Sequence, residues 1–210
     1  NLKYLAMSEY KIILKTISLI SLLGLIFAVS LSITFEKSNP LIKQNKIEFK
    51  TKLLNEILDG LDYDNNLINT YITVKPNDLL KNKTVTNVYL AKKNNILQAV
   101  LIESIAPDGY SGDITILTAI NSNDEIIGSR IIDHKETPGL GDYIDQKKST
   151  WIFNLNGMSL SNRADLDWRV KKDQGTFDYK AGATITPRAV INSVKNTLLF
   201  YKENKELFND

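Results

Sequence analysis

Residues 113–136 decide the fold class, and they read DITILTAINSNDEIIGSRIIDHKE. Apolar and polar residues alternate on both sides of the polar segment NSND, residues 121–124. A period of two with many β-branched side chains predicts two strands, and the polar segment between them predicts a hairpin turn. Such alternation leaves one face of the sheet in water, which favours antiparallel over parallel pairing.

A second hairpin is predicted immediately upstream. Residues 85–106 read VTNVYLAKKNNILQAVLIESIA, and the pair Asn94-Asn95 separates two apolar runs. Downstream of both hairpins the pattern is mixed, with short helical pieces and a predicted strand at residues 167–172, DWRVKK. The outer part of the chain is therefore expected to contain an antiparallel sheet.

Two helices are predicted beside this sheet. Residues 39–60 have a proline in the first turn, apolar residues at helical spacing and a glycine at the end, which is typical of an amphipathic helix. Near the C-terminus, Thr186 can cap a helix and Pro187 suits its first position. The apolar stripe of this last helix comprises Val190, Ile191, Val194, Leu198 and Tyr201. The elements together predict one α+β domain, an antiparallel sheet with flanking helices.

Residues 16–35, TISLISLLGLIFAVSLSITF, contain no charged side chain. About 20 such residues cross the hydrocarbon core of a membrane as a helix. The apolar core of a signal peptide is shorter, about 7–15 residues, and this run continues past a possible cleavage site at residues 28–30. A retained anchor is therefore favoured over a cleaved signal peptide.

The charges beside the anchor predict its orientation. Lys11 and Lys15 precede the apolar run, and cytoplasmic flanks are enriched in lysine and arginine. We therefore expect a cytoplasmic N-terminus at residues 1–15, a transmembrane helix at residues 16–36 and an extracytoplasmic domain at residues 37–210.

The composition excludes several kinds of site. The 210 residues include no cysteine and one histidine, which excludes disulfides, thiolate iron–sulfur clusters and Cys/His zinc sites. An electron carrier in this chain would have to be organic, and no metal site is expected. The net charge is +2, from 26 basic and 24 acidic residues, which argues against a nucleic-acid surface.

Two glycine-containing motifs follow predicted strands. Residues 134–143, HKETPGLGDY, can bring backbone amides close to a flat or anionic ligand. This motif is no dinucleotide fingerprint, because Ile144 stands where the third glycine belongs. Residues 106–114, APDGYSGDI, offer Ser111 as a nucleophile, but the order differs from the Gly-x-Ser-x-Gly elbow and disfavours a hydrolase. The turn around Gly109 and Gly112 is instead expected to line the same cleft as the first motif.

A third motif precedes the last helix, at residues 178–190, DYKAGATITPRAV. Gly182 and Ala183 leave the backbone open, and Thr184 lies beside a helix start, where unpaired amides favour a phosphate. Lys180 would add a positive charge. The alternative is an ordinary capping turn with Thr186 as the cap.

The three motifs, in this order and behind a single anchor, closely resemble the G subunit of the bacterial Rnf/Rsx electron-transport complex. The likeness covers nearly the whole chain. A more distant likeness is to the C subunit of the sodium-pumping NADH:quinone reductase, which shares the flavin-binding domain type.

The resemblance implies that Thr184 carries FMN through a phosphoester bond, made by a separate flavin transferase with FAD as donor. Asp178 matches the acidic residue of the transferase recognition motif, whereas Ala181 replaces the usual serine or threonine. In the motif before the last helix, the implied cofactor contacts are Asp178, Lys180, Gly182, Ala183 and Thr184. On the loop side they are Glu136, Thr137, Gly139, Leu140 and Gly141.

The implied function is an electron relay in the bacterial inner membrane, as one subunit of a complex between ferredoxin and the NAD pool that transports ions. Partners would be other membrane subunits, lipid and the flavin transferase, and no catalytic residue is implied. The anchor has no acidic residue, so ion translocation would belong to other subunits. Two alternatives stay open: the quinone-reductase subunit, and an anchored assembly module without a redox group.

Overall fold

The computed structural model describes the backbone of residues 2–208 and the side chains of residues 11–208. The chain divides into two compact units, one up to Phe49 and one from Lys50 onward. The first unit is helical, and the second contains the sheet and the remaining helices.

Helix α1 runs from Leu2 to Ile57 and contains Pro40. Within the described residues it is the one helix long and apolar enough to cross a membrane, and the side chains of its apolar segment are exposed. Hydroxyl groups in this segment bond back to the helix, as when Ser30 Oγ donates to the carbonyl of Ile26 at 2.8 Å. The sequence predicted two separate helices, at residues 16–36 and at residues 39–60, and this was wrong. Pro40 lacks one amide donor, but the helical backbone continues through it.

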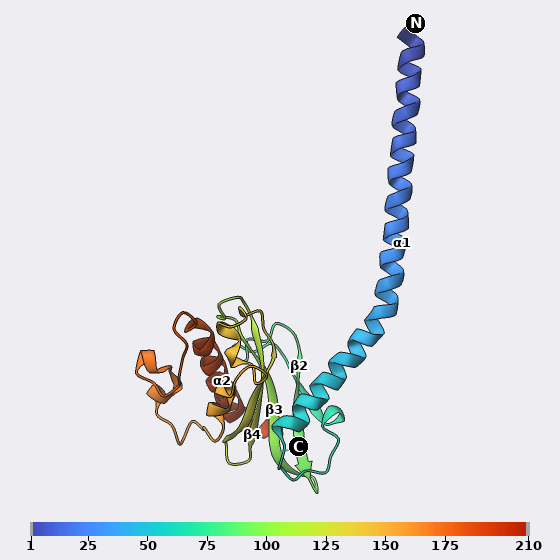
Figure 1. The fold of residues 1–210 in the computed structure, drawn as a ribbon. Coiled ribbons are helices and arrows are strands. Elements are labelled where there is room, and N and C mark those ends of the chain that lie inside the picture. Colours follow the sequence, from blue (N-terminus) through green and yellow to red (C-terminus); the bar gives the residue numbers. More distant parts are fainter. Residues whose placement is uncertain (1, 209–210) are drawn as a thin grey trace. The chain divides into compact units, whose positions relative to one another are not determined.

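Five antiparallel strands form one sheet in the order β1-β2-β3-β4-β5 (Figure 1). Their bounds are Tyr71–Val74, Thr86–Lys93, Ile96–Ala106, Ile114–Asn121 and Ile126–Asp133. The pairs β2–β3 and β4–β5 are the two predicted hairpins, which are thereby confirmed. Strand β1 was not predicted.

The turn between β2 and β3 consists of Asn94 and Asn95, with φ angles of 50° and 64°. Both angles are left-handed, and asparagine tolerates this region better than most residues do. A two-residue turn of this hand matches the twist of the flanking strands, so the asparagine pair fixes this end of the hairpin.

Replacing Asn95 with alanine should therefore destabilise the protein by about 1 kcal/mol, because alanine pays the steric cost of a positive φ. Replacing it with glycine should cost nothing. Chemical denaturation of both variants measures the difference, and equal stabilities for the two would contradict the turn assignment.

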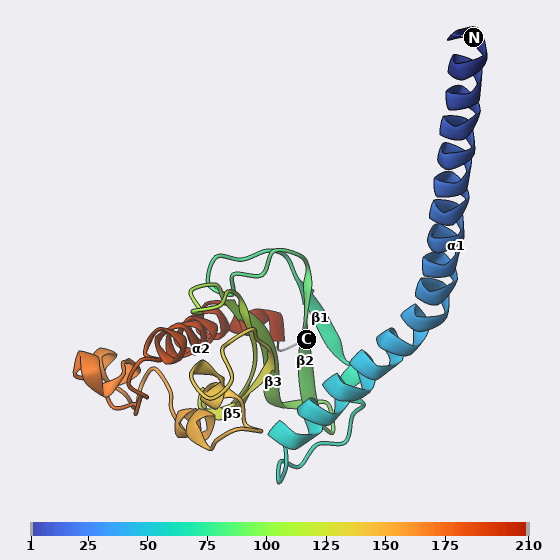
Figure 2. The same cartoon turned by 45° about the horizontal axis from the view of Figure 1, so that its top comes forward.

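Helix α2, Ile185–Glu203, covers one face of the sheet (Figure 2). A buried contact joins the two elements, where Ser104 Oγ of β3 lies 3.1 Å from Ser193 Oγ of α2. All five residues of the predicted apolar stripe, from Val190 to Tyr201, are buried. This prediction is confirmed.

The last turns of α1 cover the other face. Lys50 Nζ lies 2.5 Å from a carboxylate oxygen of Glu103 in β3, and Leu53 and Leu54 are buried. Ile57 lies against Gly128 of β5. The prediction that one face of the sheet is exposed to solvent was therefore wrong, because the centre of the sheet is buried on both sides. The predicted antiparallel pairing was right.

Short 3₁₀ helices lie before β1, between β5 and α2, and after α2. Their bounds are Leu67–Asn69, Gly141–Ile144, Trp151–Leu155, Asp165–Trp168, Lys171–Asp173 and Lys205–Phe208. The predicted strand at residues 167–172 was wrong, because only Val170 forms a bridge, to Phe177. Its alternation reflects burial of Trp168 and Val170 in irregular backbone that turns back at Gln174, in the left-handed region.

Candidate functional site

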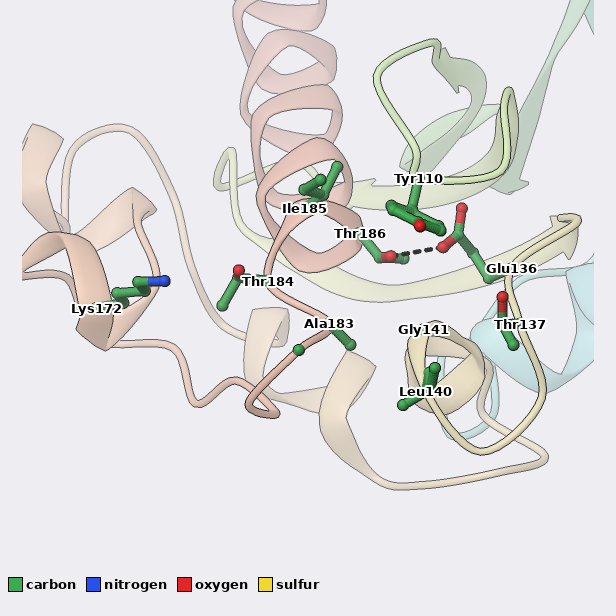
Figure 3. Close-up of a pocket in the computed structure, with 11 residues that line it drawn as sticks. Tyr110, Glu136, Thr137, Leu140, Gly141, Lys172, Ala183, Thr184, Ile185 and Thr186 are labelled. Atoms are coloured by element: carbon green, nitrogen blue, oxygen red, sulfur yellow. Dashed lines mark hydrogen bonds between the residues drawn. The ribbon is translucent and has the colours of Figure 1, made fainter.

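A pocket of about 230 Å³ lies where three loops meet the first turn of α2 (Figure 3). Its lining residues are Tyr110, Glu136, Thr137, Leu140, Gly141, Lys172, Gly182, Ala183, Thr184, Ile185 and Thr186. All three motifs singled out in the sequence contribute to this lining. The turn around Gly109 and Gly112 places Tyr110 at the pocket, in agreement with the prediction for that turn.

The turn before α2 is narrow and fixed by backbone contacts. Gly182 has a φ of 82°, and the amide of Ala183 donates to the carbonyl of Lys180 at 3.0 Å. From the other side, the Tyr143 hydroxyl donates to the carbonyl of Ala183 at 3.2 Å. Burial raises the pKa of Tyr143, so the hydroxyl stays a neutral donor. Thr184 follows this turn directly.

Thr184 occupies the N-cap position of α2 and is half-buried. In the described structure its side chain makes no capping hydrogen bond, so its hydroxyl is available at the pocket. The sequence placed the cap at Thr186, which was wrong by two residues. Thr186 is buried, and its hydroxyl donates to Glu136 at 2.6 Å instead.

Glu136 connects all three loops. It is 4% exposed, and its two carboxylate oxygens accept from the Ser111 amide at 3.0 Å and from the Thr186 hydroxyl at 2.6 Å. A Cβ added at Gly141 would lie 2.5 Å from the Glu136 carboxylate and 2.8 Å from the Thr186 hydroxyl, so a larger residue there would displace these two side chains. Glu136 therefore holds the loops in the arrangement that forms the pocket.

The loop from Thr137 to Gly141 has its own internal supports. Gly139 has a φ of 80°, and its amide donates to a carboxylate oxygen of Asp142 at 2.8 Å. The amide of Leu140 donates to the carbonyl of Thr137 at 3.1 Å. These contacts shape the PGLG turn and present Leu140 to the pocket.

His134 serves the same loop. Its Nδ1 accepts from the amide of Glu136 at 3.1 Å, and its Nε2 lies 3.9 Å from a carboxylate oxygen of Asp145. Ser111 is held through its backbone amide. This geometry indicates that the His134 imidazole has a structural role and does not act as a general base for Ser111.

Three residues of the sequence-predicted site lie outside the lining. Asp178 is exposed and pairs with Lys171 at 2.5 Å, while its carbonyl accepts from the Trp151 indole at 2.7 Å. Lys180 Nζ lies 5.0 Å from the centre of the Tyr143 ring. Gly139 shapes the loop through its left-handed backbone conformation and does not line the pocket.

Four lining residues were missed by the sequence analysis as individual contacts: Tyr110, Lys172, Ile185 and Thr186. Ile185 and Thr186 are next to the predicted Thr184, so a helix start placed at Ile185 would have included them. No sequence motif marks Lys172 as a pocket residue, because only the tertiary fold brings its segment to the pocket.

The lining suits an amphipathic ligand. Tyr110, Leu140 and Ile185 are large apolar residues that are 70%, 49% and 46% exposed. Beside them lie the hydroxyl of Thr184 and the amine of Lys172. Pockets that enclose a drug-sized ligand measure roughly 300–1,000 Å³, so this one covers part of such a ligand and leaves the rest accessible. Among the described residues, no group of three His, Cys, Asp or Glu side chains could hold a metal ion.

Comparison with known proteins identifies the class first. Residues 109–199 match the FMN-binding domain family, and this segment contains every residue that lines the pocket. The chain thus contains an FMN-binding domain, and the pocket lies within it.

Similarity over the whole chain identifies the family. The chain is 38% identical to the G subunit of the ion-translocating oxidoreductase complex from Shewanella piezotolerans, over 93% of this chain and 92% of that one. It is 39% identical to the protein of the same name from Aliivibrio fischeri, over 92% of each chain. A third, from Pseudomonas aeruginosa, is 39% identical over 79% of this chain and 77% of that one. The chain belongs to the family of G subunits of ion-translocating oxidoreductase complexes, and it is membrane-anchored through α1.

Proposed function

We propose that this chain relays electrons within an ion-translocating oxidoreductase complex, through FMN joined to Thr184 by a phosphoester bond. One observation carries the covalent part of the proposal. The Thr184 hydroxyl is uncommitted to helix capping, lies at the pocket of a flavin-binding domain, and follows a Gly-Ala pair that leaves its approach open. When bound, FMN supplies a ring system that accepts and donates electrons.

The residues present fit this cofactor. The first amides of α2 have no partners within the helix, and a helix N-terminus favours a phosphate group. Tyr110, Leu140 and Ile185 offer apolar surface to a flat ring. Because the pocket is small, an edge of the ring stays accessible for exchange with a partner subunit.

The attachment requires a second enzyme. In the transfer, the phosphorus of the FMN half of FAD forms a bond to Thr184 Oγ, its bond to the AMP half breaks, and AMP leaves. A threonine hydroxyl is a weak nucleophile without a base, so the proton must pass to a base of the transferase. Asp178 is exposed outside the pocket, as recognition by an external enzyme requires.

The apolar segment supports a location for this relay at the membrane. We propose residues 16–36 as the transmembrane helix, with residues 1–15 in the cytoplasm and the flavin domain on the outer side of the bacterial inner membrane. Residues 16–35 carry no charged side chain, so ion conduction falls to the other subunits of the complex.

The test uses protein purified from its native membrane and denatured in a gel. Under ultraviolet light, the band should fluoresce as flavin, and peptide mass mapping should locate FMN on Thr184. A dark band whose Thr184 peptide has its unmodified mass would overturn the proposal and favour an assembly module without a redox group.

A further inference from the structure

Lys172 approaches the pocket from outside the three sequence motifs. It belongs to the 3₁₀ helix Lys171–Asp173, and Figure 3 shows its side chain extending toward Thr184. Among the described residues that line the pocket, Lys172 is the one with a basic side chain. The acidic lining residue, Glu136, already accepts two hydrogen bonds of its own.

An ion pair ties this segment to α2. Arg188 donates to both carboxylate oxygens of Asp173, from Nε at 2.6 Å and from Nη2 at 2.7 Å. These hydrogen bonds hold the pKa of Asp173 below its ordinary value. Exposed ion pairs usually contribute little, but a two-pronged arginine–carboxylate pair fixes geometry. Because Arg188 lies in the first turns of α2, the pair anchors the residue beside Lys172 to the helix that begins after Thr184.

The backbone of the segment is equally constrained. A Cβ at Gly175 would overlap the carbonyl of Arg169, so only glycine allows the chain to turn back there. The amide of Gly175 donates to the carbonyl of Val170 at 3.1 Å, and that of Phe177 donates to the carbonyl of Arg169 at 3.1 Å. The base of the loop is thus fixed on both sides of Lys172.

We propose that Lys172 is the cation that neutralises the phosphodiester linking flavin to Thr184, and that the Asp173–Arg188 pair positions it. This inference rests on the proposed function, because it needs a phosphodiester on Thr184. The linkage carries one negative charge, and an ammonium group at the pocket stabilises it in the product and during transfer. Lys172 takes no part in bond making.

The first experiment measures the initial rate of flavin incorporation into the full-length chain by a flavin transferase with FAD. We expect Lys172→Gln to slow it roughly 10-fold, in line with the loss of one charge-assisted hydrogen bond, and Lys172→Arg to retain most of the rate. Lys202→Gln, at the far end of α2, removes the same charge outside the pocket and should leave the rate unchanged. The ratio between wild type and Lys172→Gln should shrink as salt screens the pair.

The positioning role has its own test. Asp173→Arg and Arg188→Asp should each slow incorporation, and the double exchange, which restores the pair with reversed charges, should recover it. The second readout is the phosphorus NMR chemical shift of the fully loaded protein. This shift should change in Lys172→Gln and stay the same in Lys202→Gln. A purely structural role for Lys172 would leave it unchanged in both variants.

The outcomes separate the two proposals. Wild type that carries flavin on Thr184, with Lys172→Gln equal to it in both rate and resonance, would overturn the role of Lys172 alone. Wild type without flavin on Thr184, after treatment with transferase and FAD, would overturn the proposed function and this inference with it.

Discussion

Replacing Thr184 with valine is expected to remove all covalently bound flavin and leave the domain folded. Valine matches threonine in shape but lacks the hydroxyl that forms the phosphoester bond. The stability cost should be within about 1 kcal/mol, because the Thr184 side chain makes no capping hydrogen bond in the described structure. Flavin fluorescence in a denaturing gel measures the loss, and circular dichroism checks the fold.

Two matched variants sharpen this prediction. Thr184→Ser keeps a hydroxyl at the same position and should retain covalent flavin. Thr150→Val removes an exposed threonine hydroxyl outside the pocket lining and should leave the attachment intact. A fluorescent band from Thr184→Val, or a dark one from Thr150→Val, would contradict attachment at Thr184.

Replacing Glu136 with alanine should destabilise the folded protein by about 2–4 kcal/mol. The carboxylate is 4% exposed and accepts from the Ser111 amide and the Thr186 hydroxyl. Hydrogen bonds to a charged group contribute about 1.5–3 kcal/mol each, and buried donors left without a partner cost more than the bond itself. Chemical denaturation of the full chain in detergent, followed by the fluorescence of the buried Trp151 and Trp168, measures the change.

The control for Glu136 is the conservative change to glutamine. Glutamine preserves the shape and one carbonyl acceptor, so its cost should be well below that of alanine. Glu206→Ala removes an exposed carboxylate and should change stability by less than about 0.5 kcal/mol. If Glu136→Ala were as stable as Glu206→Ala, the three loops would not depend on Glu136.

Much of the fold was predictable from local pattern. Alternating runs with polar turns at Asn94-Asn95 and at residues 121–124 define two hairpins, and both form. The apolar stripe from Val190 to Tyr201 defines α2 and is buried. These predictions succeed because strand and helix periodicity are properties of neighbouring residues.

Other features depended on partners distant in the sequence. Residues 113–136 predicted a sheet with one wet face, but the end of α1 covers that face, through contacts such as Lys50 with Glu103. The alternation at residues 167–172 predicted a strand, but no neighbouring strand is available to pair with more than Val170. Local pattern cannot show which surfaces find a partner.

The site divides in the same way. The sequence by itself determined the apolar anchor segment, the PGLG loop and the Gly-Ala-Thr turn, because each is a short run of residues whose chemistry is local. Only the tertiary structure decided that Thr186 turns from capping to Glu136, 50 residues away, and that Lys172 faces Thr184. The physical reason is that burial and hydrogen bonding select partners by proximity in space, which the folded sheet and α2 establish together.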